Sequence, residues 1–338
     1  MRRIIITGAL GQIGSELTAY LRSLYGEDAV LATDIRQREG MAEQAEHYRT
    51  LDVLDRAAVL AAAKQHRADT IIHLAALLSA TAEAQPQLAW HLNVDGLVHV
   101  LETARELGCQ LFVPSSIAVF GEGTPRSATP QDTLQRPNTM YGVGKVAGEL
   151  LCDYYYAKYG VDARGIRFPG LISHTAPPGG GTTDYAVDMY VFAAAQGRYT
   201  SYIAPDTYLD MMYMPDAVRA IVQLMEADGS RLTHRNAFNV SAMSVDPEAI
   251  ARSIRRYVPH FQLDYKIDPV RQRIADSWPD ALDVSAARDE WGFAPAYDLD
   301  RMTADMLRNL GGAEGAAAGV DGAMDGAGAV RVQSKAER

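Results

Sequence analysis

Short apolar runs and longer amphipathic stretches alternate through the first half of the chain. Runs rich in apolar and β-branched residues cover 3–7, 30–33, 70–74, 111–114 and 163–168 and predict strands. Between them, apolar residues at helical spacing predict helices over 15–25, 55–66, 86–107 and 141–159, with Pro86 in a first turn that tolerates proline. Strands separated by helices of this length form βαβ units, so the pattern predicts an α/β fold with a doubly wound parallel sheet.

The second half of the chain has a less regular pattern. A Pro/Gly-rich loop spans 177–183, and seven further prolines between 205 and 295 separate short elements. This pattern predicts a smaller C-terminal cap that binds substrate over the open end of the sheet. We expect a nucleotide-binding unit of residues 1–169 with a return segment at 209–242, and a cap of residues 170–208 and 243–310.

Composition changes abruptly near the C-terminus. Gly and Ala fill 15 of the 28 positions from 311 to 338, and none of the 28 is aromatic. Such a segment buries too little apolar surface to offset the entropy of ordering it, so we predict a disordered tail there. The rest of the 338-residue chain is long enough for about two structural units.

Charge and cysteine content exclude several classes of function. The formal net charge is −10, which disfavours a nucleic-acid or anionic-membrane partner. No apolar run approaches the roughly 18 residues that span a bilayer. Two cysteines form neither a Cys-rich zinc site nor a disulfide framework, and they favour a reducing, cytoplasmic location.

A glycine-rich segment joins the first predicted strand to the first predicted helix. Its glycines are Gly8, Gly11 and Gly14, with Gln12 and Ile13 between the last two. Glycine at these positions permits a tight turn, close approach of a pyrophosphate and close packing of helix on strand. The helix N-terminus then offers free N–H groups to phosphates, so the segment indicates dinucleotide binding by a Rossmann fold.

Acidic residues after the next strands refine the cofactor prediction. Asp34 lies 20 positions after Gly14, where a carboxylate binds the ribose hydroxyls of NAD and repels the 2′-phosphate of NADP. Arg36 and Arg38 are close by in the sequence and weaken the exclusion of NADP. Asp52 and Val53 follow a third expected strand and either meet the adenine or form a turn.

A tyrosine and a lysine stand four residues apart at the start of the helix predicted over 141–159. Residues at i and i+4 share a helix face, so the Lys145 ammonium can lie near the Tyr141 phenol. A nearby cation favours the phenolate, which then acts as a general base toward an alcohol. Tyr154 and Lys158 have the same spacing, but no serine is suitably placed for them, and we interpret them as packing and surface residues.

Two serines follow the strand predicted over 111–114. The carboxyl edge of an open parallel sheet is where ligands bind, so a hydroxyl there can orient the reacting oxygen. Spacing alone does not choose between Ser115 and Ser116, and a serine at a strand end also serves to cap backbone groups.

Four segments together resemble the extended short-chain dehydrogenase/reductase superfamily. They are TGALGQIG at 7–14, HLAA at 73–76, SSIAVFG at 115–121 and YGVGK at 141–145. The resemblance implies Ser116, Tyr141 and Lys145 as the catalytic residues and Asn93 as part of the proton path. With Asp34 and the glycine segment, it implies cofactor contacts at Ile35, Asp52, Val53, Leu74, Ala75, Ala76, Asn93, Tyr141, Lys145 and Leu171.

Five further segments resemble the short-chain type of L-threonine 3-dehydrogenase. They lie at 77–80, 169–173, 181–186, 211–216 and 277–279. The resemblance implies NAD as cofactor, L-threonine as substrate, 2-amino-3-oxobutanoate as product and no metal. It also implies that Ser79, Gly181, Thr182 and Thr183 contact the substrate and that Trp278 closes over it, although a lone tryptophan is more often a core residue.

Other functions and an assembly remain open at the level of sequence. A nucleotide-sugar 4-epimerase of the same superfamily would share Ser116, Tyr141 and Lys145 but would need basic residues for a diphosphate. A non-catalytic NAD-sensing regulator would be expected to lose the Tyr141–Lys145 pair. The resemblance also implies a homodimer through the helices over 87–107 and 141–159, with Leu97, Leu101 and residues 154–156 as candidates for the interface.

Overall fold

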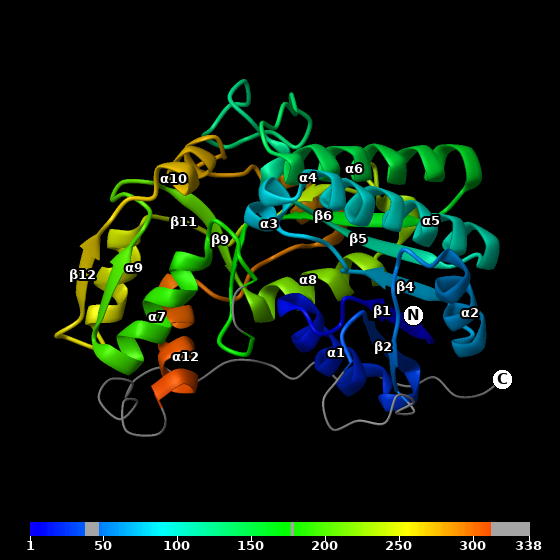
Figure 1. Cartoon of the computed structure of the whole chain (residues 1–338), viewed down its shortest axis with the longest axis horizontal. Coiled ribbons are helices and arrows are strands. Elements are labelled where there is room, and N and C mark those ends of the chain that lie inside the picture. The colour runs from blue at the N-terminus through cyan, green and yellow to red at the C-terminus, as the bar shows by residue number, and fades with distance from the viewer. Residues whose placement is uncertain (38–46, 177–178, 312–338) are drawn as a thin grey trace.

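The computed structural model describes residues 1–37, 47–176 and 179–311 of the chain (Figure 1). Its largest element is a seven-stranded parallel sheet in the order β10-β6-β5-β4-β1-β2-β3. The strands are β1 (Ile4–Thr7), β2 (Val30–Asp34), β3 (Tyr48–Thr50), β4 (Thr70–His73), β5 (Gln110–Ser116), β6 (Ala163–Phe168) and β10 (Phe238–Asn239). The prediction of a doubly wound α/β fold is confirmed.

Helices cover both faces of this sheet because its strands are apolar on both sides. Ile4 and Ile6 belong to a core shared with α1 (Gln12–Tyr25) and α8 (Met214–Glu226). Ile5 points the other way, into a core shared with α2 (Arg56–His66), α5 (Gly96–Leu107) and α6 (Met140–Tyr159). This alternation is the two-residue period of a strand buried on both faces.

The helix predicted over 86–107 is interrupted in the structure. It consists of α4 (Pro86–Trp90), a π-helical turn η2 (His91–Asp95) and α5. A short helix α3 (Ser79–Ala84), which the sequence pattern did not predict, precedes it. Such π-helical turns frequently occur at functional sites, and this one holds Asn93.

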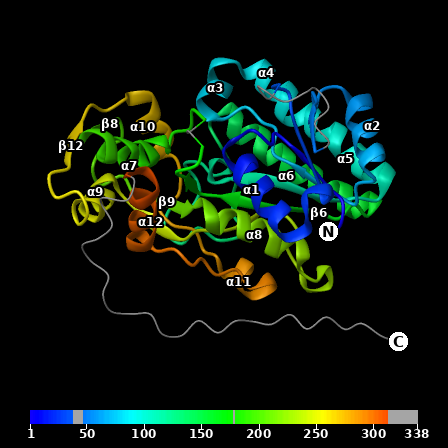
Figure 2. The same ribbon diagram turned by 90° about the horizontal axis from the view of Figure 1, so that it is seen from below.

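The second half forms a smaller lobe beside the sheet (Figures 1 and 2). A three-stranded sheet contains β7 (Gly170–Ile172), β9 (Leu209–Tyr213) and β11 (Met243–Val245), and a two-stranded sheet pairs β8 (Arg198–Ser201) with β12 (Gln262–Tyr265). Besides α8, the helices of the second half are α7 (Asp184–Gln196), α9 (Pro247–Arg255), α10 (Pro269–Asp276), α11 (Ser285–Trp291) and α12 (Leu299–Gly311). The described residues also contain three 3₁₀ turns: η1 (Glu27–Ala29), η3 (Ile117–Val119) and η4 (Gly229–Arg231).

The predicted domain division differs in detail from the packing. In the proposed return segment, α8 packs on α1 and β10 joins the large sheet, but β9 lies in the three-stranded sheet. Trp291 and Phe293, assigned to the cap, pack in the core around α1 and α8. The predicted tail lies outside the described residues except for Gly311, which ends α12.

Three of the proposed interface residues are core residues of the protomer. Leu97 and Leu101 are 2% and 0% exposed, in the core beneath α2, α5 and α6, and Tyr155 is buried with them. Tyr154 and Tyr156 instead lie at the surface. No helix within the described ranges is both long and apolar enough to cross a lipid bilayer.

Candidate functional site

The glycine segment brings backbone against backbone at the carboxyl edge of the sheet. A Cβ on Gly8, whose φ is +70°, would lie 2.6 Å from the Ala75 nitrogen, and one on Gly14 would lie 2.3 Å from the Gly8 oxygen. Gly11 is the N-cap residue of α1 and makes no side-chain cap, so N–H groups of the first turn remain available. The Gln12 side-chain nitrogen is buried without a partner. This uncapped, close-packed helix start fits the phosphates of a dinucleotide.

Asp34 ends β2 with its carboxylate buried and ionised. It accepts N–H groups from Leu10 at 3.0 Å and from the Arg36 main chain at 3.1 Å, and the Arg36 Nε lies 3.0 Å away. Burial raises the pKa of this carboxyl, but the bonds from Arg36 and Leu10 outweigh it and hold the pKa below its ordinary value. A carboxylate for ribose hydroxyls and a guanidinium that suits a 2′-phosphate therefore stand side by side.

The other residues predicted near the adenosine lie outside the main pocket. Ile35 is exposed. β3 ends at Thr50, so Asp52 follows the strand and its carboxylate accepts the Leu54 N–H at 2.9 Å, as a turn residue does. Val53 is buried against Gly96, and Arg38 lies outside the described residues.

The start of α6 places Tyr141 beside the end of β5. The Thr139 hydroxyl accepts the Gly142 N–H at 3.1 Å and caps the helix, so Tyr141 falls in its first turn. A Cβ on Gly142 would lie 2.2 Å from the Ala118 oxygen. Glycine is therefore required for α6 to approach the turn that follows Ser116 this closely.

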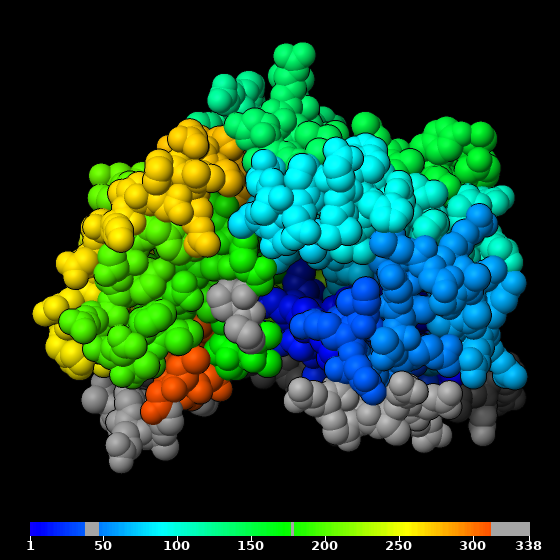
Figure 3. Space-filling view, in the orientation of Figure 1, coloured from blue at the N-terminus to red at the C-terminus, as the bar shows by residue number. Residues whose placement is uncertain are grey.

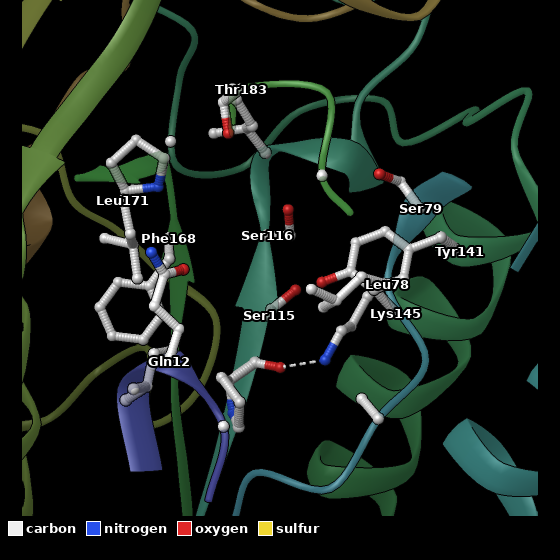
Figure 4. Close-up of a pocket in the computed structure, with 18 of the residues that line it drawn as sticks. Gln12, Leu78, Ser79, Ser115, Ser116, Tyr141, Lys145, Phe168, Leu171 and Thr183 are labelled. Atoms are coloured by element: carbon white, nitrogen blue, oxygen red, sulfur yellow. Dashed lines mark hydrogen bonds between the residues drawn. The ribbon is translucent and has the colours of Figure 1, made fainter. Parts of the chain in front are cut away.

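The two serines at the end of β5 have different partners. The Ser116 hydroxyl lines the pocket together with Tyr141, lowers the pKa of the Tyr141 phenol and accepts the Ala118 N–H at 3.2 Å. The Ser115 hydroxyl donates to the Glu149 carboxylate and is buried. Both lie near the Tyr141 hydroxyl in Figure 4, and of the two it is Ser116 that lowers the pKa of the phenol.

Burial dominates the electrostatics of Tyr141 and Lys145. The Lys145 Nζ donates to the Pro114 oxygen at 2.7 Å and lies 5.5 Å from the centroid of the Tyr141 ring. Burial lowers the pKa of Lys145 to about 8, against the opposing charge of Glu149. Burial likewise raises the pKa of Tyr141 to about 12, and Ser116 reduces that rise. At neutral pH the pair is therefore an ammonium and a neutral phenol.

Two polar residues near the pair are held by neighbouring groups. His73 is buried, with Nδ1 2.8 Å from the Thr7 hydroxyl, and burial followed by the Lys145 charge lowers its pKa to about 3. Asn93 donates to the Leu77 oxygen at 3.0 Å and accepts the Leu77 N–H at 2.8 Å. The oxygen and the nitrogen of the Asn93 side-chain amide thus both hold the chain that follows β4. Asn93 does not line the main pocket.

A pocket of about 230 Å³ unites most of the predicted site. Figure 3 shows a hollow between the lobes with the earliest part of the chain at its floor. The predicted residues that line the pocket are Gly8, Gly11, Gln12, Ile13, Gly14, Leu74, Ala76, Ser79, Ser116, Tyr141, Lys145, Leu171, Gly181, Thr182, Thr183 and Trp278. The predicted residues that do not line it are Asp34, Ile35, Asp52, Val53, Ala75 and Asn93.

Trp278 and Gly181 have structural roles besides lining the pocket. Trp278 is only 5% exposed and packs in the core of the smaller lobe, so it is both a core residue and a pocket wall. The Gly181 N–H donates to Asp184 at 2.7 Å, as does the Gly180 N–H at 2.9 Å. These two loop N–H groups are therefore engaged by Asp184.

Sequence reasoning missed several residues of the pocket wall. Phe168, Pro169 and Gly170 line it where β6 ends, Leu78 lines it just before α3, and Asp184 lines it at the start of α7. Phe168 and Leu78 are labelled in Figure 4. The sheet-edge argument applied to Ser116 also covers Phe168, because β6 pairs with β5 in parallel and Phe168 is in register with Ser116. Within the described ranges, no group of three His, Cys, Asp or Glu side chains is arranged to hold a metal ion.

Comparisons with known proteins agree on the family. Residues 4–241 match the NAD dependent epimerase/dehydratase family. An uncharacterized epimerase/dehydratase of Staphylococcus saprophyticus is 58% identical over 315 residues, which are 93% of this chain and 98% of that protein.

Two solved structures are also similar. An L-threonine dehydrogenase from Clostridium difficile is 60% identical, with a TM-score of 0.89 over 92% of this chain and 98% of its own. The holo form of a GalE-like L-threonine dehydrogenase from Cupriavidus necator is 47% identical, with a TM-score of 0.88 over 91% of this chain and 99% of its own. The chain therefore belongs to the NAD dependent epimerase/dehydratase family.

Proposed function

We propose that this protein is a metal-independent L-threonine 3-dehydrogenase that uses NAD. The observation that carries the proposal is the meeting of Ser116, Tyr141 and Lys145 with the glycine segment in one pocket. The likeness to L-threonine dehydrogenases at 60% and 47% identity supports the choice of substrate. The product is 2-amino-3-oxobutanoate, a β-keto acid that can lose carbon dioxide.

In the proposed reaction, the C3 hydroxyl of threonine loses its proton and C3 loses a hydride. When bound, NAD accepts the hydride and adds positive charge beside the phenol. The Ser116 hydroxyl orients the substrate oxygen, and Tyr141 removes its proton as a phenolate. The Lys145 ammonium stabilises that phenolate through its charge. We further propose that Ser79, Thr182 and Thr183 hydrogen-bond the amino-acid group of the substrate.

The charges of the pocket favour a small zwitterion over a nucleotide sugar. Among the described residues that line it, only Lys145 and Asp184 are charged. A nucleotide-sugar 4-epimerase would need cations for the substrate diphosphate beyond those that hold the cofactor. A non-catalytic NAD sensor would have no use for Ser116, Tyr141 and Lys145 together in one pocket. The pocket therefore favours threonine oxidation over both alternatives.

Spectrophotometric detection of NADH tests the proposal. Purified protein with NAD should reduce the cofactor with L-threonine far faster than with L-serine or 3-hydroxybutyrate, and should not epimerise UDP-galactose. NADP should support a slower reaction, because Asp34 is ionised beside Arg36. No NADH from L-threonine together with epimerisation of UDP-galactose would replace the proposal with the epimerase.

We also propose a cytoplasmic homodimer. The two cysteines, Cys109 and Cys152, are free thiols, which suits a reducing compartment. Tyr154 and Tyr156 leave an exposed aromatic surface on α6 that a second copy can cover. Sedimentation of the wild type and of a Tyr154→Glu variant measures the assembly, and the variant should sediment as a monomer.

A further inference from the structure

Glu149 lies one helical turn beyond Lys145 and has no part in the chemistry described above. Its carboxylate is buried and accepts bonds from Arg167 Nε at 2.9 Å, Arg167 Nη2 at 2.8 Å and Gln135 at 2.7 Å. The Ser115 hydroxyl also donates to it. Four donors fit the ionised carboxylate, which only accepts hydrogen bonds. Elements distant in sequence thus converge to keep one negative charge inside the protein.

The charge of Glu149 lies close to that of Lys145. Residues at i and i+4 share a helix face, and both side chains line a cavity of about 20 Å³ behind the main pocket. Asn93, Cys152 and Asn236 also line this cavity. Low dielectric makes a charge act more strongly there than at a surface.

The remaining titratable groups around Lys145 do not replace this charge. His73 on β4 and Tyr141 on α6 are neutral at neutral pH. Burial raises the pKa of the Cys152 thiol, so it too is neutral. Asp153 is a further turn away from Lys145 than Glu149, and its carboxylate accepts Asn236 at 2.7 Å. The Arg167 guanidinium is bound to Glu149 itself.

We propose that Glu149 is a positioning residue that keeps Lys145 in its ammonium form while Tyr141 removes the substrate proton. Burial disfavours the ammonium, and Glu149 supplies the nearest opposing charge. Arg167, Gln135 and Ser115 hold that charge in place. This assigns Ser115 a role distinct from that of Ser116. The proposal rests on the dehydrogenase chemistry above, but its test does not require turnover.

Titration of the lysines by NMR tests the proposal directly. The chain has five lysines, so protein labelled with ¹³C at lysine Cε gives few signals, and the Lys145 signal is the one missing from Lys145→Arg. In the wild type without cofactor or substrate, Lys145 should titrate near pH 8. In Glu149→Gln its midpoint should fall by about one pH unit, because an opposing charge has been removed. Asp153→Asn is the matched control and should leave the midpoint in place.

A second variant and a second measurement cover the case in which Glu149→Gln does not fold. The double variant Glu149→Gln, Arg167→Gln removes both buried charges, and its Lys145 midpoint should fall by less, because a like charge is lost together with the nearer opposing one. In active protein, Glu149→Gln should lower kcat/KM and move the basic limb of its pH profile to lower pH, because the Lys145 ammonium is lost at lower pH. An unchanged Lys145 midpoint in either folded variant overturns the proposal. A shifted midpoint in a protein that does not oxidise threonine overturns only the proposed function.

Discussion

Helix α6 carries the same two residue types at the same spacing at each of its ends. Tyr141 and Lys145 start the helix in the pocket, and Tyr154 and Lys158 end it at the surface. In the surface pair, the ammonium donates to the phenol oxygen at 2.5 Å and lies 5.1 Å from the ring centroid. In the pocket pair, the ammonium bonds a backbone oxygen instead. The pair with the more direct contact is therefore the one outside the pocket.

The pKa values of the tyrosine and the lysine shift in opposite directions in the two pairs. The bond from Lys158 lowers the pKa of Tyr154, and that bond raises the pKa of Lys158. Burial raises the pKa of Tyr141 to about 12 and lowers that of Lys145 to about 8. Spacing thus brings the groups together, while burial makes the pocket pair sensitive to any further charge that enters. Solvent screens the surface pair from such charges.

The largest expected difference between the two ends of α6 is the effect on kcat of replacing each tyrosine. Tyr141→Phe should lower kcat for threonine oxidation by about 10³-fold, because a general base is lost. Binding of NAD, measured by calorimetry, should remain. Tyr154→Phe is the matched control and should retain wild-type kcat. Substantial turnover in Tyr141→Phe would show that another group removes the proton.

The sequence predicted the start of α6 better than its surroundings. The strand and helix pattern suffices for the parallel sheet, because each strand is buried on both faces and each helix has one apolar face. Tyr141, Lys145 and the glycine segment follow from local spacing. The choice between Ser115 and Ser116 does not, because it depends on Glu149, which approaches from 34 residues away.

The misses have a common physical cause. Leu97 and Leu101 are apolar positions on a predicted helix, and only the packing of α2 and α6 decides that they are internal. The π-helical turn at Asn93 is set by its bonds to Leu77, 16 residues distant. The sequence predicts a third strand that ends next to Asp52, but β3 ends at Thr50 and Asp52 lies in a turn, the alternative that the sequence leaves open. Each outcome depends on a tertiary contact that local pattern does not encode.

The pH dependence of stability should differ in sign between the two lysines. The pKa of Lys145 falls from 10.5 to about 8 on folding, so between these values the unfolded chain binds more protons and stability rises with pH. The stability of the wild type relative to Lys145→Met should therefore increase by about 3 kcal/mol from below pH 8 to above pH 10.5.

The matched variant at the other end of α6 is Lys158→Met. The pKa of Lys158 is raised on folding, so its contribution to stability is present below the unfolded pKa and is lost as pH rises through the folded value. Urea unfolding across this pH range measures both differences. A slope of the same sign for the two variants would contradict the assignment of burial as the cause of the Lys145 shift.

The smallest expected effects come from replacing one glycine near each pair. Gly142 lies between Tyr141 and Lys145, and Gly160 follows Lys158. Gly142→Ala places a Cβ 2.2 Å from the Ala118 oxygen, so α6 must move away from η3, the turn that follows β5, at a cost of about 2 kcal/mol. Gly160→Ala meets no atom within 4 Å but must adopt a φ of +71°, which costs about 1 kcal/mol. Urea denaturation measures both losses, and kinetics distinguish their causes. Only Gly142→Ala should also lower kcat, because the movement of α6 separates Tyr141 from Ser116. Equal losses of kcat in the two variants would mean that they arise from general destabilisation, and not from a shift of Tyr141 caused by moving α6 away from η3.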